Sequence, residues 1–207
     1  PHITAATAMD ALTHATEAFT CMAKNPLSDA YATAAVKKVS QSLLSVMDNP
    51  KDSDGRLELA QGSTMAGIAF SNSMVGLVHS LGHATGAICH LPHGLCMSLY
   101  LPYVLEFNLE SIREPLGELL LYLEGPDVYS ATPASRRAEA SISAIRKLRD
   151  ALYKRCELPR TLKETGKVLE NQLESIAKLA LDDGSIMFNP REVSHEDAMA
   201  VLRRAWA

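Results

Sequence analysis

Residues 77–94 read LVHSLGHATGAICHLPHG and contain four of the seven histidines of the chain: His79, His83, His90 and His93. Packing of an apolar core does not require so many imidazoles in so short a stretch. His79 and His83 are four residues apart, so they share one face if the stretch is helical. Pro92 and Gly94 flank His93, which indicates a turn just beyond that helix, where Pro92 restricts the backbone. The stretch therefore predicts a helix followed by a rigid turn that carries one more histidine.

A second stretch, MDALTHATEAF at residues 9–19, carries Asp10 and His14 at the same helical spacing. Two donors on one helix face can form half of a divalent metal site. The alanines and leucine around them make the stretch apolar, so a buried Asp10 carboxylate would need a partner. Because this spacing is also frequent by chance, an aspartate in a first helical turn and an ordinarily hydrogen-bonded histidine remain the alternative.

If the two stretches met in the fold, the Asp10–His14 pair and histidines of the second stretch could form a site of one carboxylate and three imidazoles. Nitrogen and oxygen donors without a thiolate suit Fe²⁺, Zn²⁺ or a similar ion. A thiolate at Cys89 or Cys96 would instead favour structural Zn²⁺. Each histidine taken singly is also compatible with a core or capping role, and a helical interaction module with incidental histidines is the corresponding alternative function.

Apolar residues recur with a helical period through the rest of the chain, and no stretch alternates as a strand does. The pattern predicts helices over residues 29–48, 57–79, 95–107 with a break or kink at Pro102, 142–152, 169–180 and 194–206. Ser194 with Asp197 three residues later resembles a helix N-cap. Loops are expected at residues 49–55, 124–133, 156–161 and 184–190. We predict one all-α domain over residues 1–207, an array of about eight to ten helices.

Composition narrows the classes of function. The chain is 47% hydrophobic and 21% charged, with a net charge of −4, which gives no electrostatic reason to expect nucleic acid or an anionic membrane as partner. No apolar run is long enough to span a bilayer, and no signal peptide is recognisable. The four cysteines form no CxxC pattern, so free thiols in a reducing cytoplasm are expected. There is no glycine-rich phosphate-binding motif.

Together with LYLPYVLEFN at residues 99–108 and the closing FNPREVSHEDAMAVLRRAW at residues 188–206, the two histidine-bearing stretches resemble the C-terminal half of the iron-containing (group III) alcohol dehydrogenases. In that family the two histidine motifs are separated by a similar distance. The resemblance implies an all-helical metal-binding domain packed beside an N-terminal α/β domain that binds the dinucleotide. The chain begins at Pro1, where the second domain of the family begins, so the nucleotide-binding half is expected to be missing.

The resemblance also assigns roles to individual residues. The family's metal ligands fall on these positions: Asp10, His14, His79 and His93. His83 matches a residue that the family keeps beside the metal and the nicotinamide, and we expect it to be a catalytic proton relay. Phe70, in AGIAFSN at residues 66–72, matches an aromatic position expected to line the cofactor cleft, with core packing as the alternative. His90 has no assigned role and is expected to be exposed, like His2 and His195.

The activity implied is hydride exchange between NAD(P) and an alcohol or carbonyl compound whose oxygen is polarised by Fe²⁺, or by Zn²⁺ as a substitute. The expected partners are a small alcohol or aldehyde, the N-terminal nucleotide-binding domain and, as often in the family, a second copy of the chain. The isolated chain is expected to be inactive. Two alternatives stay open: a glycerol dehydrogenase-like enzyme, and a non-catalytic metal-binding domain or split subunit that needs a partner chain.

Overall fold

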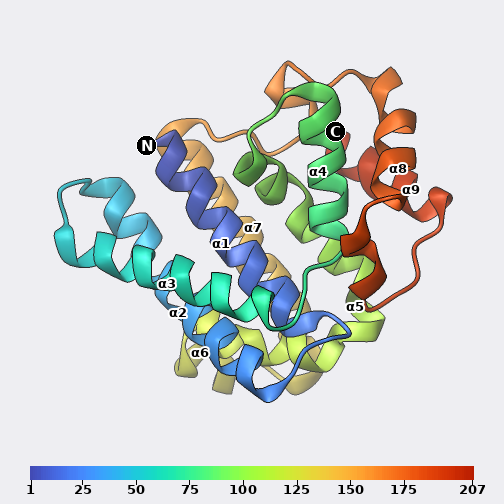
Figure 1. Cartoon of the computed structure of the whole chain (residues 1–207). Helices are drawn as coiled ribbons and strands as arrows, with labels where there is room; N and C mark the ends of the chain where they lie inside the picture. The colour runs from blue at the N-terminus through green and yellow to red at the C-terminus, as the bar shows by residue number, and fades with distance from the viewer.

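Helix α1 (His2–Thr20) crosses the middle of the molecule and packs against α2 (Pro26–Asp48), α3 (Ser53–Ser71) and α5 (His93–Glu124), as Figure 1 shows. Alanines at most turns of α1 let these helices approach closely. Its buried threonines donate their hydroxyls to backbone carbonyls four residues earlier, at 2.7–2.8 Å: Thr13, Thr16 and Thr20. The helix therefore satisfies these buried hydroxyls internally.

The structure is a computed structural model that describes all residues from 1 to 207, with nine α-helices, four short 3₁₀-helices and no strand. The other α-helices are α4 (Leu77–Cys89), α6 (Pro126–Ala131), α7 (Arg137–Cys156), α8 (Leu173–Leu181) and α9 (His195–Trp206). The 3₁₀-helices are η1 (Ala134–Arg136), η2 (Lys163–Thr165), η3 (Glu170–Gln172) and η4 (Gly184–Phe188). The predicted all-α fold is confirmed. No helix has the length and apolar character needed to cross a membrane.

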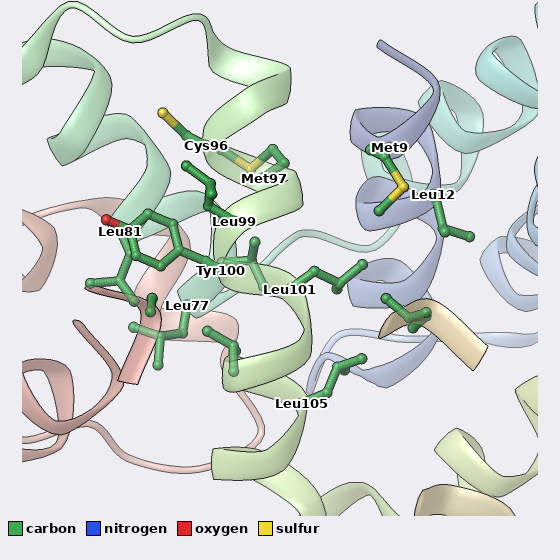
Figure 2. Packing of buried hydrophobic residues seen from close by; sticks show 14 of the residues in the cluster. Met9, Leu12, Leu77, Leu81, Cys96, Met97, Leu99, Tyr100, Leu101 and Leu105 are labelled. Carbon is green, nitrogen blue, oxygen red and sulfur yellow. The ribbon is translucent and has the colours of Figure 1, made fainter. Parts of the chain in front are cut away.

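Helix α5 lies between α1 and α4 and is buried on opposite faces (Figure 2). Leu101 extends from α5 toward α1, where Met9 lies, whereas Tyr100 lies beside Leu81 of α4. All four side chains are fully buried. The hydroxyl oxygens of Tyr100 and Thr85 are 2.6 Å apart, so the one polar atom that Tyr100 brings into the core is hydrogen-bonded. This packing fixes the axis of α5 relative to the two helices that carry the other site residues.

Two helix predictions need correction. A break or kink was expected at Pro102, but helix α5 continues through this residue without a break. A proline removes one hydrogen bond from a helix interior, but Pro102 is buried and α5 packs on both faces around it, which outweighs the loss. The predicted helix over residues 57–79 is two helices, because α3 ends at Ser71 and α4 begins at Leu77. Between them, the carbonyl of Asn72 accepts a hydrogen bond from the Asn25 side chain at 2.8 Å, which holds the turn in place.

Helix boundaries follow local signals elsewhere. The predicted cap of α9 is confirmed, because Ser194 Oγ accepts from the Asp197 N–H at 3.1 Å and Asp197 Oδ2 accepts from the Ser194 N–H at 3.0 Å. Helix α2 ends before Asn49, as predicted, but begins at Pro26 because Asn25 caps its first turn. The regions expected to be loops at 124–133 and 184–190 contain the short helix α6 and the 3₁₀-helix η4.

The start of α4 is held by residues from two other parts of the chain. Gly76 precedes the helix and has no side chain to cap it. The first two backbone N–H groups of α4 donate instead to Asn189 Oδ1, at 3.3 Å, and to Glu17 Oε1, at 2.8 Å. Asn189 also exchanges two amide hydrogen bonds with Asn108 of α5, at 2.8 and 2.9 Å. The position of α4 therefore depends on α1, on α5 and on the segment before α9.

The start of α5 lies directly against α1 at Gly94. A Cβ atom on Gly94 would be 2.5 Å from the carbonyl oxygen of Ala6 and 2.9 Å from its carbonyl carbon. Because both atoms belong to backbone, no side-chain rotation could relieve the contact. Glycine at this position therefore allows the close approach that holds His93, the first residue of α5, next to α1.

We expect Gly94→Ala to lower the free energy of unfolding by about 1–2 kcal/mol, because the overlap with the α1 backbone outweighs the gain in helix propensity. Chemical denaturation of the two proteins measures the difference. Gly67→Ala is the matched control, since no atom lies within 4 Å of a Cβ at Gly67 in α3. That variant should be stabilised by up to about 1 kcal/mol. Equal stability of the two variants would show that α5 does not depend on this contact.

Candidate metal centre

Three helices bring the four candidate ligands together. Asp10 and His14 lie one turn apart on α1, His79 lies in the first turn of α4, and His93 is the first residue of α5. One potential ligand atom from each of the four lies within 4.8 Å of every other. The two histidine-bearing stretches therefore meet in the fold, and their four donors surround one point.

In two of the histidine rings, the Nδ1 atom is occupied by a contact within the protein, which leaves Nε2 available. The Nδ1 atom of His14 lies 3.0 Å from the backbone carbonyl oxygen of Asp10, which can only accept, so this nitrogen donates and Nε2 is left free. The Nδ1 atom of His79 lies 2.5 Å from Oε2 of Glu17. Its Nε2 atom is buried and has no hydrogen-bond partner.

The carboxylate of Asp10 also has an atom without a hydrogen-bond partner. Its Oδ1 atom is buried without a hydrogen-bond partner, although it lies 3.2 Å from Nε2 of His93 and 3.5 Å from Nδ1 of His14. Orphaned buried acceptors are costly in a folded protein. Two of them side by side, Asp10 Oδ1 and His79 Nε2, fit a cation held between them.

Burial and neighbouring charges shift the pKa values in the cluster. Burial, together with the nearby His79, lowers the pKa of His14 to about 4, so its imidazole is neutral at neutral pH. Burial alone would raise the pKa of Asp10, but contact with His93 and the other imidazoles brings it below the ordinary value. The contact with Asp10 raises the pKa of His93. The cluster thus contains an ionised carboxylate and at least one neutral imidazole, which are the forms that bind metal ions.

His83 and Phe70 lie at the edge of the cluster. His83 is one turn after His79 on α4, and its ring centroid is 5.3 Å from that of His93. Its Nδ1 atom lies 2.8 Å from Oδ2 of Asp183, which orients the ring. Phe70, near the end of α3, stacks on His14 with the ring centroids 4.4 Å apart. The structure brings both residues to the four candidate ligands.

The other histidines and the cysteines lie outside the cluster. His90 is exposed at the C-cap of α4, as predicted, and His2 is exposed too. His195 is half-buried, with Nε2 3.3 Å from Glu174 Oε1. All four cysteines are free and buried, in agreement with the expected free thiols. Cys89 Sγ contacts Gln172 Oε1 at 3.4 Å, so the alternative of a thiolate-containing zinc site has no geometric support.

Sequence reasoning missed two carboxylates. Glu17 is buried and contacts both His79 and the first turn of α4. A signal for it existed, because Glu17 follows His14 by three residues and so lies on the same face of α1. Asp183 is one hundred residues from its partner His83 in the chain, and nothing local to Asp183 indicates the contact.

The exposure of the side chains divides the cluster into a closed and an open side. The side chain of His79 is 3% exposed and that of His14 is 18% exposed. Those of His83 and His93 are 41% and 42% exposed. A small molecule can therefore approach the four donors from the side of His83 and His93.

The sequence and the fold of this chain both match known proteins. Residues 4–206 match the family model for the C-terminal part of the Fe-containing alcohol dehydrogenase family. Alcohol dehydrogenase 4 of Saccharomyces cerevisiae is 33% identical over 208 aligned positions, which cover 100% of this chain and 51% of the yeast protein. The NAD-dependent methanol dehydrogenase of Bacillus methanolicus is 34% identical over 203 positions, which cover 98% of this chain and 51% of that protein.

A solved structure agrees with these sequence relatives. The crystal structure of 1,3-propanediol oxidoreductase matches 98% of this chain and 51% of its own with a TM-score of 0.91 and 31% sequence identity. This chain spans about half the length of the relatives that it matches. The match to the C-terminal family description over nearly all residues means that the chain belongs to the Fe-containing alcohol dehydrogenase family.

Proposed function

We propose that this chain is the metal-binding half of an NAD(P)-dependent alcohol dehydrogenase. The ion would be Fe²⁺, with Zn²⁺ as a substitute, and its ligands would be Asp10, His14, His79 and His93. The observation that carries the proposal is the meeting of these four donors at one point, with buried acceptor atoms on Asp10 and His79 that nothing in the protein satisfies. Three imidazoles and a carboxylate form a donor set suited to either ion.

A metal ion at this centre would supply Lewis acidity toward the oxygen of an alcohol or carbonyl compound, for hydride exchange with NAD(P). The residues of the chain would then hold, orient and shield the reactants. Because His93 and His83 are the exposed members of the cluster, the substrate oxygen would approach between them.

His83 is positioned to carry a proton between this side and solvent. Its ring lies close to His93 but is partly exposed, and Asp183 holds its Nδ1 atom. The other ring nitrogen is therefore free to exchange a proton with a substrate hydroxyl and then with water. Phe70, stacked on His14, would shield the neighbouring side of the site from solvent and line the cofactor cleft.

The dinucleotide phosphates would bind to a second, N-terminal domain. This chain has no glycine-rich loop that could cradle a pyrophosphate. The relatives it matches are about twice as long, and the methanol dehydrogenase among them is named for its dependence on NAD. Residues of that domain would determine the choice between NAD and NADP. They would also contribute much of the preference for a particular alcohol.

We expect His79→Ala and His93→Ala each to abolish stoichiometric binding of Zn²⁺ to the chain, as measured by isothermal titration calorimetry. The loss should exceed the roughly 10–100-fold weakening that is typical of changes around a metal site rather than in it. Metal analysis after anaerobic loading with Fe²⁺ provides a second measurement. His90→Ala is the matched control, since His90 is exposed at the C-cap of α4 and lies outside the cluster. Equal binding by all variants would exclude a metal site at this cluster.

We expect His83→Ala, in a protein that includes the nucleotide-binding half, to reduce turnover by about 100-fold through the lost proton relay. Metal content should not change, because His83 is not among the four donors. Asp183→Asn should have a smaller effect, since an amide oxygen can still accept from the imidazole. Steady-state kinetics and metal analysis measure both variants. Normal turnover in His83→Ala would eliminate the relay.

A further inference from the structure

Glu17 is the one carboxylate buried beside the cluster that the proposed metal chemistry does not use. Its side chain is 6% exposed, and no lysine or arginine pairs with it. Oε1 accepts a hydrogen bond from the Val78 N–H at 2.8 Å, and Oε2 lies 2.5 Å from Nδ1 of His79. A buried carboxylate is retained only where its partners compensate for lost hydration. Here both of its oxygens have a specific nitrogen partner.

The geometry determines which nitrogen of His79 carries the proton. An ionised carboxylate can only accept, so Nδ1 of His79 must be the donor at this short distance. With the proton on Nδ1, Nε2 keeps its lone pair, and this buried atom faces no protein donor. The opposite tautomer would put two lone pairs against each other at Glu17 and would bury an N–H at Nε2 without an acceptor.

We propose that Glu17 is a positioning residue that locks His79 in the Nδ1–H tautomer before any metal ion arrives. The inference rests on the proposed function, because it concerns how one of the proposed ligands is prepared. Glu17 holds the ring direction and keeps the Nε2 lone pair aimed at the centre that Asp10, His14 and His93 share. Outer carboxylates that orient a ligating histidine in this way strengthen metal binding.

The negative charge of Glu17 would also favour the binding of a divalent ion. Asp10 carries one negative charge, and the three imidazoles are neutral when they bind a metal ion. A divalent ion would therefore leave one positive charge uncompensated in a largely buried site. Glu17, in contact with His79, supplies the second negative charge.

The variant Glu17→Gln distinguishes control of the His79 tautomer from simple capping of α4. A glutamine has one acceptor oxygen and one NH₂ group, whereas the two nitrogens around position 17 both need an acceptor in the native arrangement. If its oxygen accepts from Val78, its NH₂ group faces Nδ1 of His79. The NH₂ group and Nδ1 can then form a hydrogen bond only when the proton of His79 moves to Nε2, the atom that would bind the metal.

Asn189→Ala is the matched control for the capping role. Asn189 accepts from the neighbouring N–H in the first turn of α4, whereas the hydrogen bond of the His79 ring is to Glu17. Removing its side chain weakens the same helix start and leaves the contact between Glu17 and His79 intact. If Glu17 were only a cap, Glu17→Gln and Asn189→Ala would affect metal binding alike.

The test combines nitrogen NMR with metal titration. Long-range ¹H–¹⁵N spectra of the metal-free, ¹⁵N-labelled chain report the tautomer of His79, whose signals are identified by their absence in His79→Asn. We expect the Nδ1–H tautomer in the unsubstituted chain and in Asn189→Ala, and the Nε2–H tautomer in Glu17→Gln. Titration with Zn²⁺ should show about 10–100-fold weaker binding in Glu17→Gln, and at most about threefold weaker binding in Asn189→Ala.

The possible results separate this inference from the proposed function. The Nε2–H tautomer in the unsubstituted metal-free chain would overturn the inference without any variant, so the test does not depend on Glu17→Gln folding. Equal Zn²⁺ affinity in Glu17→Gln and the unsubstituted chain would also overturn it, as would an equal loss in Asn189→Ala. Failure of the unsubstituted chain to bind Zn²⁺ or Fe²⁺ would overturn the proposed metal site, and with it the role of Glu17 in metal binding.

Discussion

The carboxylate of Glu17 is buried where the last turn of α1 meets the first turn of α4, and it joins the two helices. A helix N-terminus presents unpaired N–H groups and the positive end of the helix dipole, and Gly76 offers no side chain to satisfy them. One oxygen of Glu17 accepts from that turn while the other contacts His79. A shift of α4 along α1 would break both contacts at once and leave a buried charge without partners, so the relative position of the two helices is strongly constrained.

The third helix of the site is constrained by backbone rather than by charge. His93 is the first residue of α5, so its direction depends on where that helix begins. Gly94 allows the start of α5 to touch the backbone of α1 at Ala6, and burial of α5 on two faces fixes its axis. Donors carried by such packed helices are held in place before any ligand binds, which favours affinity because little ordering remains to be done.

Helical periodicity predicted the fold well because nearly every helix buries an apolar stripe. It allowed a break or a kink at Pro102, but the helix continues there, because burial on both faces outweighs one missing hydrogen bond. Spacing alone paired Asp10 with His14, since a helix fixes that geometry locally. The density of histidines predicted a site of one carboxylate and three imidazoles, but only the family resemblance singled out His79 and His93 from the second stretch. Asp183 could not be foreseen, because its contact with His83 spans one hundred residues without a local signal.

The residues of the cluster differ in exposure: some could bind an ion inside the protein, and others could contact a substrate. The donors on α1 and α4 are enclosed by packed helices, and His79 is nearly inaccessible. His93 and His83 face outward and are the most exposed members of the cluster, so their side is the most open approach to the centre. Under the proposed function, both the substrate oxygen and the nicotinamide would come from this open side. Because hydride transfer requires water to be kept away, and this chain leaves that side open, the proposed reaction would need a second domain to cover His83 and His93.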